Sequence, residues 1–278
     1  MSSHTNHPIP KSLLALFLWL ATMTLACAQG QSPRVSSPDG QIEFRLLLAV
    51  PPERNVENRL SYQVSFRGKP LLDTSLLGLQ MQNQSLLGVN LKLTVSKTSS
   101  LDETYEIPVG KSRTVRNHYN SLVAEYQETG ALDRRLNLEV RAYDDGVAFR
   151  YVIPQTAVLN EVRIKDEATQ FQFAHDAETY PLILRNFRTS YEDQYNRMTL
   201  SGIHPEYLIA VPFLVEQPGV GWVAITEAHI ENYAGMYLTH SDGKIMAAKL
   251  APHAEELELA VSANTPLNSP WRVLMIAS

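Results

Sequence analysis

The carboxylate of Glu227 stands where an apolar segment meets a polar turn. Residues 221–226 have the pattern of a buried strand, Glu227 follows them, and a second apolar segment opens at Met236. A carboxylate at the end of a buried strand is costly to desolvate unless a metal ion, a cation or a hydrogen-bond donor meets it. Two interpretations stay open: a ligand for a metal ion, and an ion pair at a strand end. The residues alone favour the ion pair, because perturbed acids are often structural.

His229 lies two residues beyond Glu227 and has no second His or Cys at ligand spacing nearby. An imidazole favours zinc or copper over calcium, so we interpret His229 as a polar residue at the rim of the site. The sequence contains no G-x-S-x-G elbow, no H-E-x-x-H pair and no phosphate-binding glycine loop. It therefore offers no catalytic residues for those kinds of hydrolysis.

The longest polar connection, residues 186–206, contains Tyr191, Glu192 and Tyr195. Such a loop could bind a sugar, because aromatic faces stack on pyranose rings and carboxylates accept hydrogen bonds from hydroxyls. The other interpretation is a solvated loop with ordinary tyrosines, and both stay open. Trp222 and Trp271 lie within apolar segments, which favours core positions over sugar platforms.

The elements that must position these residues are strands. From Val35 onward, apolar and polar residues alternate with a period of two, as in residues 60–66. Residues 136–142 and 147–153 predict a hairpin, because Asp-Gly at its turn can supply the positive φ of short hairpin turns. Further strands are expected at 42–48, 91–95, 122–127, 162–164, 171–173, 208–215, 221–226, 236–239, 244–250 and 257–261. Residues 271–276 are apolar at nearly every position, which predicts a strand buried on both faces.

This pattern predicts an all-β protein, a large antiparallel β-sandwich. The chain has 278 residues, of which 44% are hydrophobic and 19% charged, as expected of a globular protein. Its formal net charge of −5 means that the chain has no excess of positive charge to bind phosphates, so nucleic acid is not an expected partner.

The first 28 residues predict a signal peptide outside the fold. Lys11 precedes an apolar run at 13–21, which is short for a transmembrane anchor, and small residues follow at Ala26 and Ala28. We expect cleavage after Ala28 and a periplasmic or secreted protein. The alternative, a lipoprotein anchored through Cys27, is weaker because position 24 is threonine and not leucine.

Several stretches resemble the N-terminal domain of glycoside hydrolase family 97, which contains α-glucosidases and α-galactosidases. The likeness runs from residue 35 to 276, in ordered segments that are specific as a set. They are SSPDGQI (36–42), LSYQVSFRGKPLL (60–72), GKS (110–112), RNHYN (116–120), RAYDDGVAFRY (141–151), TEAHIENYAGM (226–236) and SPWRV (269–273).

The resemblance implies a super-sandwich of the galactose-mutarotase-like type over residues 33–276, packed against a (β/α)8 barrel. In that family the barrel supplies the carboxylate pair, and a calcium ion in the pocket takes one glutamate ligand from the sandwich. Glu227 matches that ligand. Ala234 stands where the family usually has proline, which leaves the ligand in place. The family also has an acidic and aromatic loop near the pocket, comparable to residues 191–195.

The likeness ends where the family's catalytic barrel begins. We therefore expect the barrel, with the carboxylates that glycoside hydrolysis needs, on a polypeptide not present here. The resemblance implies that the chain alone holds no catalytic residue and does not hydrolyse glycosides. The chain would form one side of the binding site for an α-linked oligosaccharide. It would provide Glu227 as a ligand for a calcium ion, which the chain binds only weakly by itself. The alternative is a stand-alone, secreted carbohydrate-binding β-sandwich module.

Overall fold

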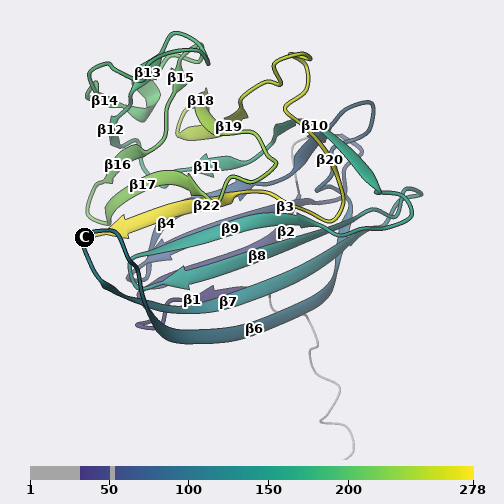
Figure 1. The fold of residues 1–278 in the computed structure, drawn as a ribbon, viewed down its shortest axis with the longest axis horizontal. Coiled ribbons are helices and arrows are strands. Elements are labelled where there is room, and N and C mark those ends of the chain that lie inside the picture. Colours follow the sequence, from purple (N-terminus) through teal and green to yellow (C-terminus); the bar gives the residue numbers. More distant parts are fainter. Residues whose placement is uncertain (1–31, 51–53) are drawn as a thin grey trace, which may run out of the picture. The chain divides into compact units, whose positions relative to one another are not determined.

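The computed structural model of the protein describes residues 32–50 and 54–278 (Figure 1). Within these ranges the regular structure consists of twenty-two strands and one 3-10 turn, η1 (Leu200–Gly202). No helix of the described ranges is long and apolar enough to cross a membrane. The expected leader, residues 1–28, lies outside the described residues. The prediction of an all-β fold is confirmed.

The largest sheet is antiparallel throughout and contains the candidate site. Its order is β14 (Met198–Thr199), β12 (Glu178–Tyr180), β16 (Phe213–Gln217), β17 (Gly221–Ala228), β22 (Trp271–Ala277), β9 (Gly146–Ile153), β8 (Arg135–Tyr143), β7 (Thr114–Glu128) and β6 (Leu91–Glu106), with β21 (Leu267–Asn268) paired to β9. In Figure 1, β22 lies between β17 and β9, so the end of the chain occupies an interior position of this sheet.

A second sheet packs against the first and closes the sandwich. It runs in chain order through β1 (Arg34–Ser36), β2 (Ile42–Ala49), β3 (Arg59–Phe66) and β4 (Lys69–Leu76). Phe44 of β2 and Tyr62 of β3 meet Phe149 of β9 with ring centroids 5.7 and 5.0 Å apart. These rings are fully buried, and alternation in each of the three strands points them inward because every second side chain of a strand points to the same face.

Two further antiparallel sheets, of five and three strands, complete the sandwich. One contains β11 (Gln170–Gln172), β19 (Ile245–Leu250), β18 (Met236–Asp242), β15 (Leu208–Ile209) and β13 (Ile183–Leu184). The other contains β20 (Val261–Asn264), β10 (Glu161–Glu167) and β5 (Leu79–Met81). The predicted strand 208–215 is divided between two sheets, and Pro212, which has no N–H for a ladder, stands at the division.

Other predicted strands differ from the structure in extent. Residues 91–95 and 122–127 are parts of the much longer strands β6 and β7. The prediction of a strand at 257–261 is wrong, since these residues form turns and β20 begins only at Val261. The apolar residues in that stretch resemble a strand, yet Leu257 is 72% exposed.

The predicted hairpin of β8 and β9 is confirmed, but the predicted reason for its turn is wrong. Tyr143 pairs with Gly146 across Asp144 and Asp145, and none of these turn residues has a positive φ. Gly146 is needed for a close approach instead. A Cβ atom there would lie 2.4 Å from the carbonyl oxygen of Leu274 in β22.

The prediction that β22 is buried on both faces is also wrong. Only alternate residues of the strand face the core, and Met275 is 56% exposed on the opposite face. Trp271 is buried, but the guanidinium groups of Arg141 and Arg150 lie against its ring, each 4.5 Å from the ring centroid. It is therefore covered by cations on the outer face of the sheet and is not part of the sandwich core.

Candidate acidic site at the end of strand β17

Glu227 lies near the end of β17, directly opposite Arg272 of β22. Arg272 Nη1 donates a hydrogen bond to Glu227 Oε2 over 2.6 Å. The backbone N–H of Met236, where β18 begins, donates to Glu227 Oε1 over 2.9 Å. Both carboxylate oxygens therefore have a donor, and the strand-end ion pair that the residues alone favour is present.

Arg272 shares its guanidinium group with a second carboxylate, that of Glu167 in β10. Arg272 Nε donates to Glu167 Oε2 over 3.1 Å, and Nη2 donates to Glu167 Oε1. Glu167 also accepts hydrogen bonds of 3.0 Å from the hydroxyl groups of Tyr233 and Thr169. The side chains of Arg272 and Glu167 are fully buried, whereas that of Glu227 retains 9% exposure. The cluster thus has one inner and one outer carboxylate.

Two carboxylates share one guanidinium group, so the cluster has a formal charge of −1. Burial raises the pKa of Glu227, and the charge of Glu167 raises it further. The charge of Arg272 and the N–H of Met236 lower it without cancelling the effect of burial. A further cation at the outer oxygens of Glu227 would stabilise its charged form.

Glu227 could contribute only one ligand to a metal ion. The described ranges contain no group of three or more His, Cys, Asp or Glu side chains placed to hold one. Calcium takes about six to eight oxygen ligands, and each oxygen of Glu227 keeps a lone pair beyond its one hydrogen bond. The residues present therefore fit calcium only as one part of a shell that other groups complete.

The structure brings Tyr191 to this acidic site. Tyr191 and Tyr237 share a hydrogen bond between their hydroxyl groups, and their ring centroids are 6.1 Å apart. Tyr237 belongs to β18 and packs edge-on against Phe187, which fixes the base of the loop. Burial, the contact with Tyr237 and the charge of Glu227 together raise the pKa of Tyr191. Its backbone φ of 61° lies in the left-handed region.

The other predicted loop residues, Glu192 and Tyr195, lie at the surface. Glu192 is exposed, and Tyr195 is 56% exposed. His229 is exposed as well, and its Nε2 lies 3.1 Å from a carboxylate oxygen of Glu231, as suits a rim residue. The structure therefore bonds Tyr191 to Tyr237, the residue after Met236 whose N–H binds Glu227, and leaves Glu192 and Tyr195 at the surface.

Sequence reasoning missed four residues that shape the site: Glu167, Tyr233, Tyr237 and Arg272. One signal was available for Arg272, because a cation inside an otherwise apolar strand must find a buried partner. No local pattern could indicate Glu167, which is 60 residues from Glu227 in the sequence.

The fold and the site define an antiparallel β-sandwich domain with an acidic cluster that opens at one strand end. The family profile described as Glycosyl-hydrolase 97 N-terminal matches residues 35–278. The chain belongs to this family, which confirms the resemblance found in the sequence.

Relatives of known activity and structure agree with the assignment. The chain is 26% identical to a retaining α-galactosidase of Bacteroides thetaiotaomicron, over 94% of the chain and 41% of the relative. It is 27% identical to a probable retaining α-galactosidase of Streptomyces bingchenggensis, over 96% of the chain and 40% of the relative. A family 97 enzyme of Pseudoalteromonas in complex with panose has a TM-score of 0.80 at 26% identity, over 88% of the chain and 35% of that enzyme. The chain thus spans about two fifths of the length of the curated relatives it matches.

Proposed function

We propose that the chain forms one wall of the active site of a calcium-dependent α-glycosidase. The catalytic barrel, and with it the carboxylates that break the glycosidic bond, would be supplied by a further domain. The main support is the cluster of Glu227, Arg272 and Glu167, which holds an incompletely neutralised carboxylate at a strand end. A domain that lacks a metal shell of its own but presents one such carboxylate is suited to complete a shell in a neighbouring domain.

Calcium is the cation that we propose for Glu227. It is a hard cation that prefers oxygen ligands, and carboxylates are among its usual partners. When bound, it would help to orient substrate hydroxyls and stabilise charge that develops during bond cleavage. Arg272 and the N–H of Met236 would hold the Glu227 carboxylate in position, because each fixes one of its oxygens.

The substrates that we propose are α-linked galactosides or glucosides. The curated relatives named above are a retaining α-galactosidase and a probable one, and a variant of the Pseudoalteromonas enzyme is in complex with panose. Loop 186–206 would contribute Glu192 and Tyr195 to the sugar site, since both are exposed, while Tyr191 anchors the loop through Tyr237.

The test is a chimera that joins this chain to the catalytic part of the Bacteroides relative. We expect calcium to bind the chimera, and the variant Glu227→Gln to weaken that binding at least tenfold in a calorimetric titration. Hydrolysis of an aryl α-galactoside should fall in parallel. The substitution keeps the shape of the side chain but removes the charge that attracts the ion.

Glu231→Gln is the matched control, because Glu231 is an exposed glutamate four residues away whose carboxylate pairs with His229. Its calcium affinity should equal that of the unmodified chimera. Equal calcium affinity in both variants, with thermal melting showing that each is folded, would refute the role of Glu227. Saturable binding of α-galactosides by the chain without a barrel would instead favour the carbohydrate-binding module.

A further inference from the structure

Within the described ranges, strand β6 is the one long free edge of the sheets. It has 16 residues, pairs only with β7 and forms the last strand of the largest sheet (Figure 1). The opposite edge of that sheet, β14, has two residues. The edge strands of the other sheets have two to four residues, except β4, which begins at Lys69-Pro70 and meets Phe173 in a bridge. A long edge presents backbone N–H and C=O groups that another strand can pair with.

The β6 edge is exposed along nearly its whole length. From Lys92 to Glu106, only Val95 and Leu101 are half-buried, and the other side chains are exposed. A β-bulge between Leu93 and Val95 makes the start of the strand irregular, as bulges at protected edges do. From Val95 on, the pairing with β7 continues without a further shift. A regular edge of residues 95–106 is therefore left for a second strand.

The charges of β6 are separated along the strand. Its two lysines, Lys92 and Lys97, lie in the first half, and its three acidic residues, Asp102, Glu103 and Glu106, lie in the second. A parallel copy of β6 would place like charges beside each other. An antiparallel copy places the basic half beside the acidic half, and opposite charges across a strand pair are stabilising. The charge pattern thus fits a second copy of this chain.

Backbone geometry limits the register of such a pair. Residues directly opposite each other in an antiparallel ladder both turn their N–H and C=O groups toward the other strand, or both turn them away. A strand that pairs with its own copy must therefore match odd residues with odd ones and even residues with even ones. Only a register with a residue opposite its own counterpart satisfies this condition.

Among these registers, the one centred on Ser100 matches the side chains best. Lys97 then lies opposite Glu103 of the second copy, and Val95 lies opposite Tyr105, which is 47% exposed in the single chain. Centring on Ser99 would place Lys97 opposite Leu101, and centring on Leu101 would place it opposite Tyr105. Two ion pairs and two apolar pairs therefore select Ser100.

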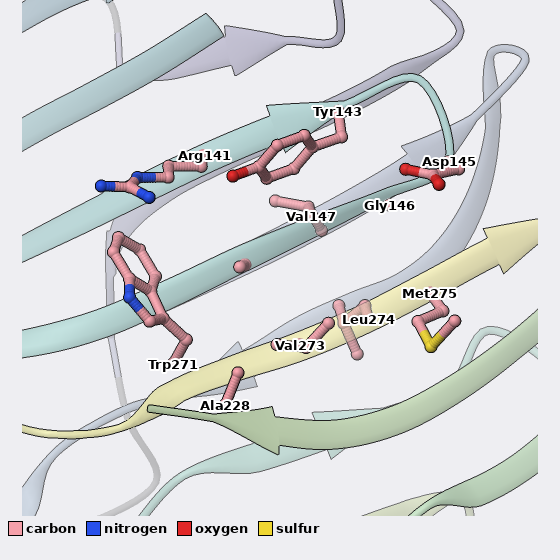
Figure 2. A pocket seen from close by; sticks show the side chains of 11 residues that line it. Arg141, Tyr143, Asp145, Gly146, Val147, Ala228, Trp271, Val273, Leu274 and Met275 are labelled. Carbon is pink, nitrogen blue, oxygen red and sulfur yellow. The ribbon is translucent and has the colours of Figure 1, made fainter. Parts of the chain in front are cut away.

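The matched side chains share the outer face of the largest sheet. Leu101 lies opposite Tyr119 of β7, and the ring of Tyr119 packs against that of Tyr143 in β8 with centroids 5.1 Å apart. Figure 2 shows Tyr143 on the face of β8 that also carries Arg141. The four matched residues follow or precede Leu101 at intervals of two, so their side chains project to this same face.

We propose that β6 pairs with β6 of a second copy of the chain, antiparallel about a two-fold axis at Ser100. The two largest sheets then form one continuous sheet. The inference does not rest on the proposed function, because β6 contributes no residue to the acidic site.

A charge exchange tests the proposal by sedimentation of the full chain over a range of concentrations. We expect a dimer that dissociates on dilution. Glu103→Lys places two lysines opposite each other twice in the dimer and should weaken association at least tenfold. Adding Lys97→Glu to Glu103→Lys restores opposite charges and should restore the dimer. Glu255→Lys is the matched control, since Glu255 is an exposed glutamate in the loop between β19 and β20, and it should leave association unchanged.

A disulfide across the two-fold axis is the second measurement. Cys27 is the only cysteine of the sequence, so a Cys27→Ser background contains no other thiol. Opposite residues of an antiparallel pair are close enough for a disulfide, and Ser100→Cys should therefore form a covalent dimer on oxidation. Ser96→Cys is the control, because it is also exposed but would lie about 26 Å from its counterpart, eight residues along the strand. It should stay monomeric.

Several results would overturn the proposal. One is a chain that sediments as a monomer at every concentration. Another is a dimer that Glu103→Lys does not weaken, since association would then use a different surface. A double variant that melts like the unmodified chain but does not associate would also contradict the register, as would equal cross-linking at positions 96 and 100.

Discussion

Arg272 lies opposite Glu227 in the neighbouring strand and forms an ion pair of 2.6 Å with it, while the rest of its guanidinium group is bound to the buried Glu167. One cation therefore joins β22 to β17 and to β10. Because Glu167 belongs to the three-stranded sheet and Glu227 to the largest sheet, Arg272 links the two sheets at the candidate site.

Removing this cation should strongly destabilise the protein. Arg272→Met leaves two carboxylates in a buried site without a cation, and breaking a buried ion pair in this way costs about 3–5 kcal/mol. We expect urea denaturation of the chain to show a loss of this size. Arg116→Met is the control, since the Arg116–Asp102 pair is exposed, and the urea midpoint should hardly change. Equal losses in both variants would contradict the importance of the shared cation.

The close approach of β9 and β22 can be tested at Gly146. Gly146→Ala should destabilise the chain by about 1–3 kcal/mol, as overpacking does elsewhere, because the added Cβ meets the carbonyl oxygen of Leu274. Gly130→Ala is the matched control, since a Cβ atom there meets nothing within 4 Å. Thermal melting of the two variants measures the difference. If the two variants melt alike, the approach of strands β9 and β22 at Gly146 is less close than the structure shows.

The buried Tyr151 should make the protein sensitive to alkali. Burial, and next the charge of Glu167, raise its pKa in the folded state above the ordinary value of 10.0. A group whose pKa is raised by folding contributes stability that is complete below the unfolded pKa and is lost as pH rises through the folded one. The free energy of unfolding should therefore fall as pH rises above 10.0.

Tyr151→Phe tests this linkage. The variant should be less stable at neutral pH by about 1 kcal/mol, because the hydroxyl group accepts a hydrogen bond from the N–H of Gly78. Its stability should nevertheless depend less steeply on pH above 10.0 than that of the unmodified chain. Denaturation curves measured at several alkaline pH values give both quantities, and parallel pH profiles would exclude Tyr151 as the responsible group.

The leader gives a prediction outside the described residues. In a Gram-negative host we expect an exported protein that begins at residue 29 and carries no lipid. Mass spectrometry of the mature protein should show this, and Cys27→Ser should leave its mass unchanged. A product that begins at a lipid-modified Cys27 would establish the lipoprotein alternative. Unprocessed protein in the cytoplasm would contradict export altogether.

The fold class could be predicted because its signal is local. Alternation in residues 60–66 and the hairpin of β8 and β9 are visible in a few neighbouring residues, and each follows from the period of two in a strand. Strand limits were less predictable. Residues 257–261 have the composition of a strand but form turns, and β6 continues far beyond its apolar start.

The sequence by itself determined that this is an all-β protein, that it resembles family 97 and that Glu227 stands at a strand end. Only the tertiary structure decided that Glu227 meets Arg272 and that Arg272 also binds Glu167, because these residues come from segments far apart in the chain. It also decided that Trp271 and Met275 face outward, since apolar side chains alone do not reveal which face of a sheet is covered. The free energy of a buried charge depends on the groups that contact it, and these contacts form only when distant segments of the chain come together in the folded protein.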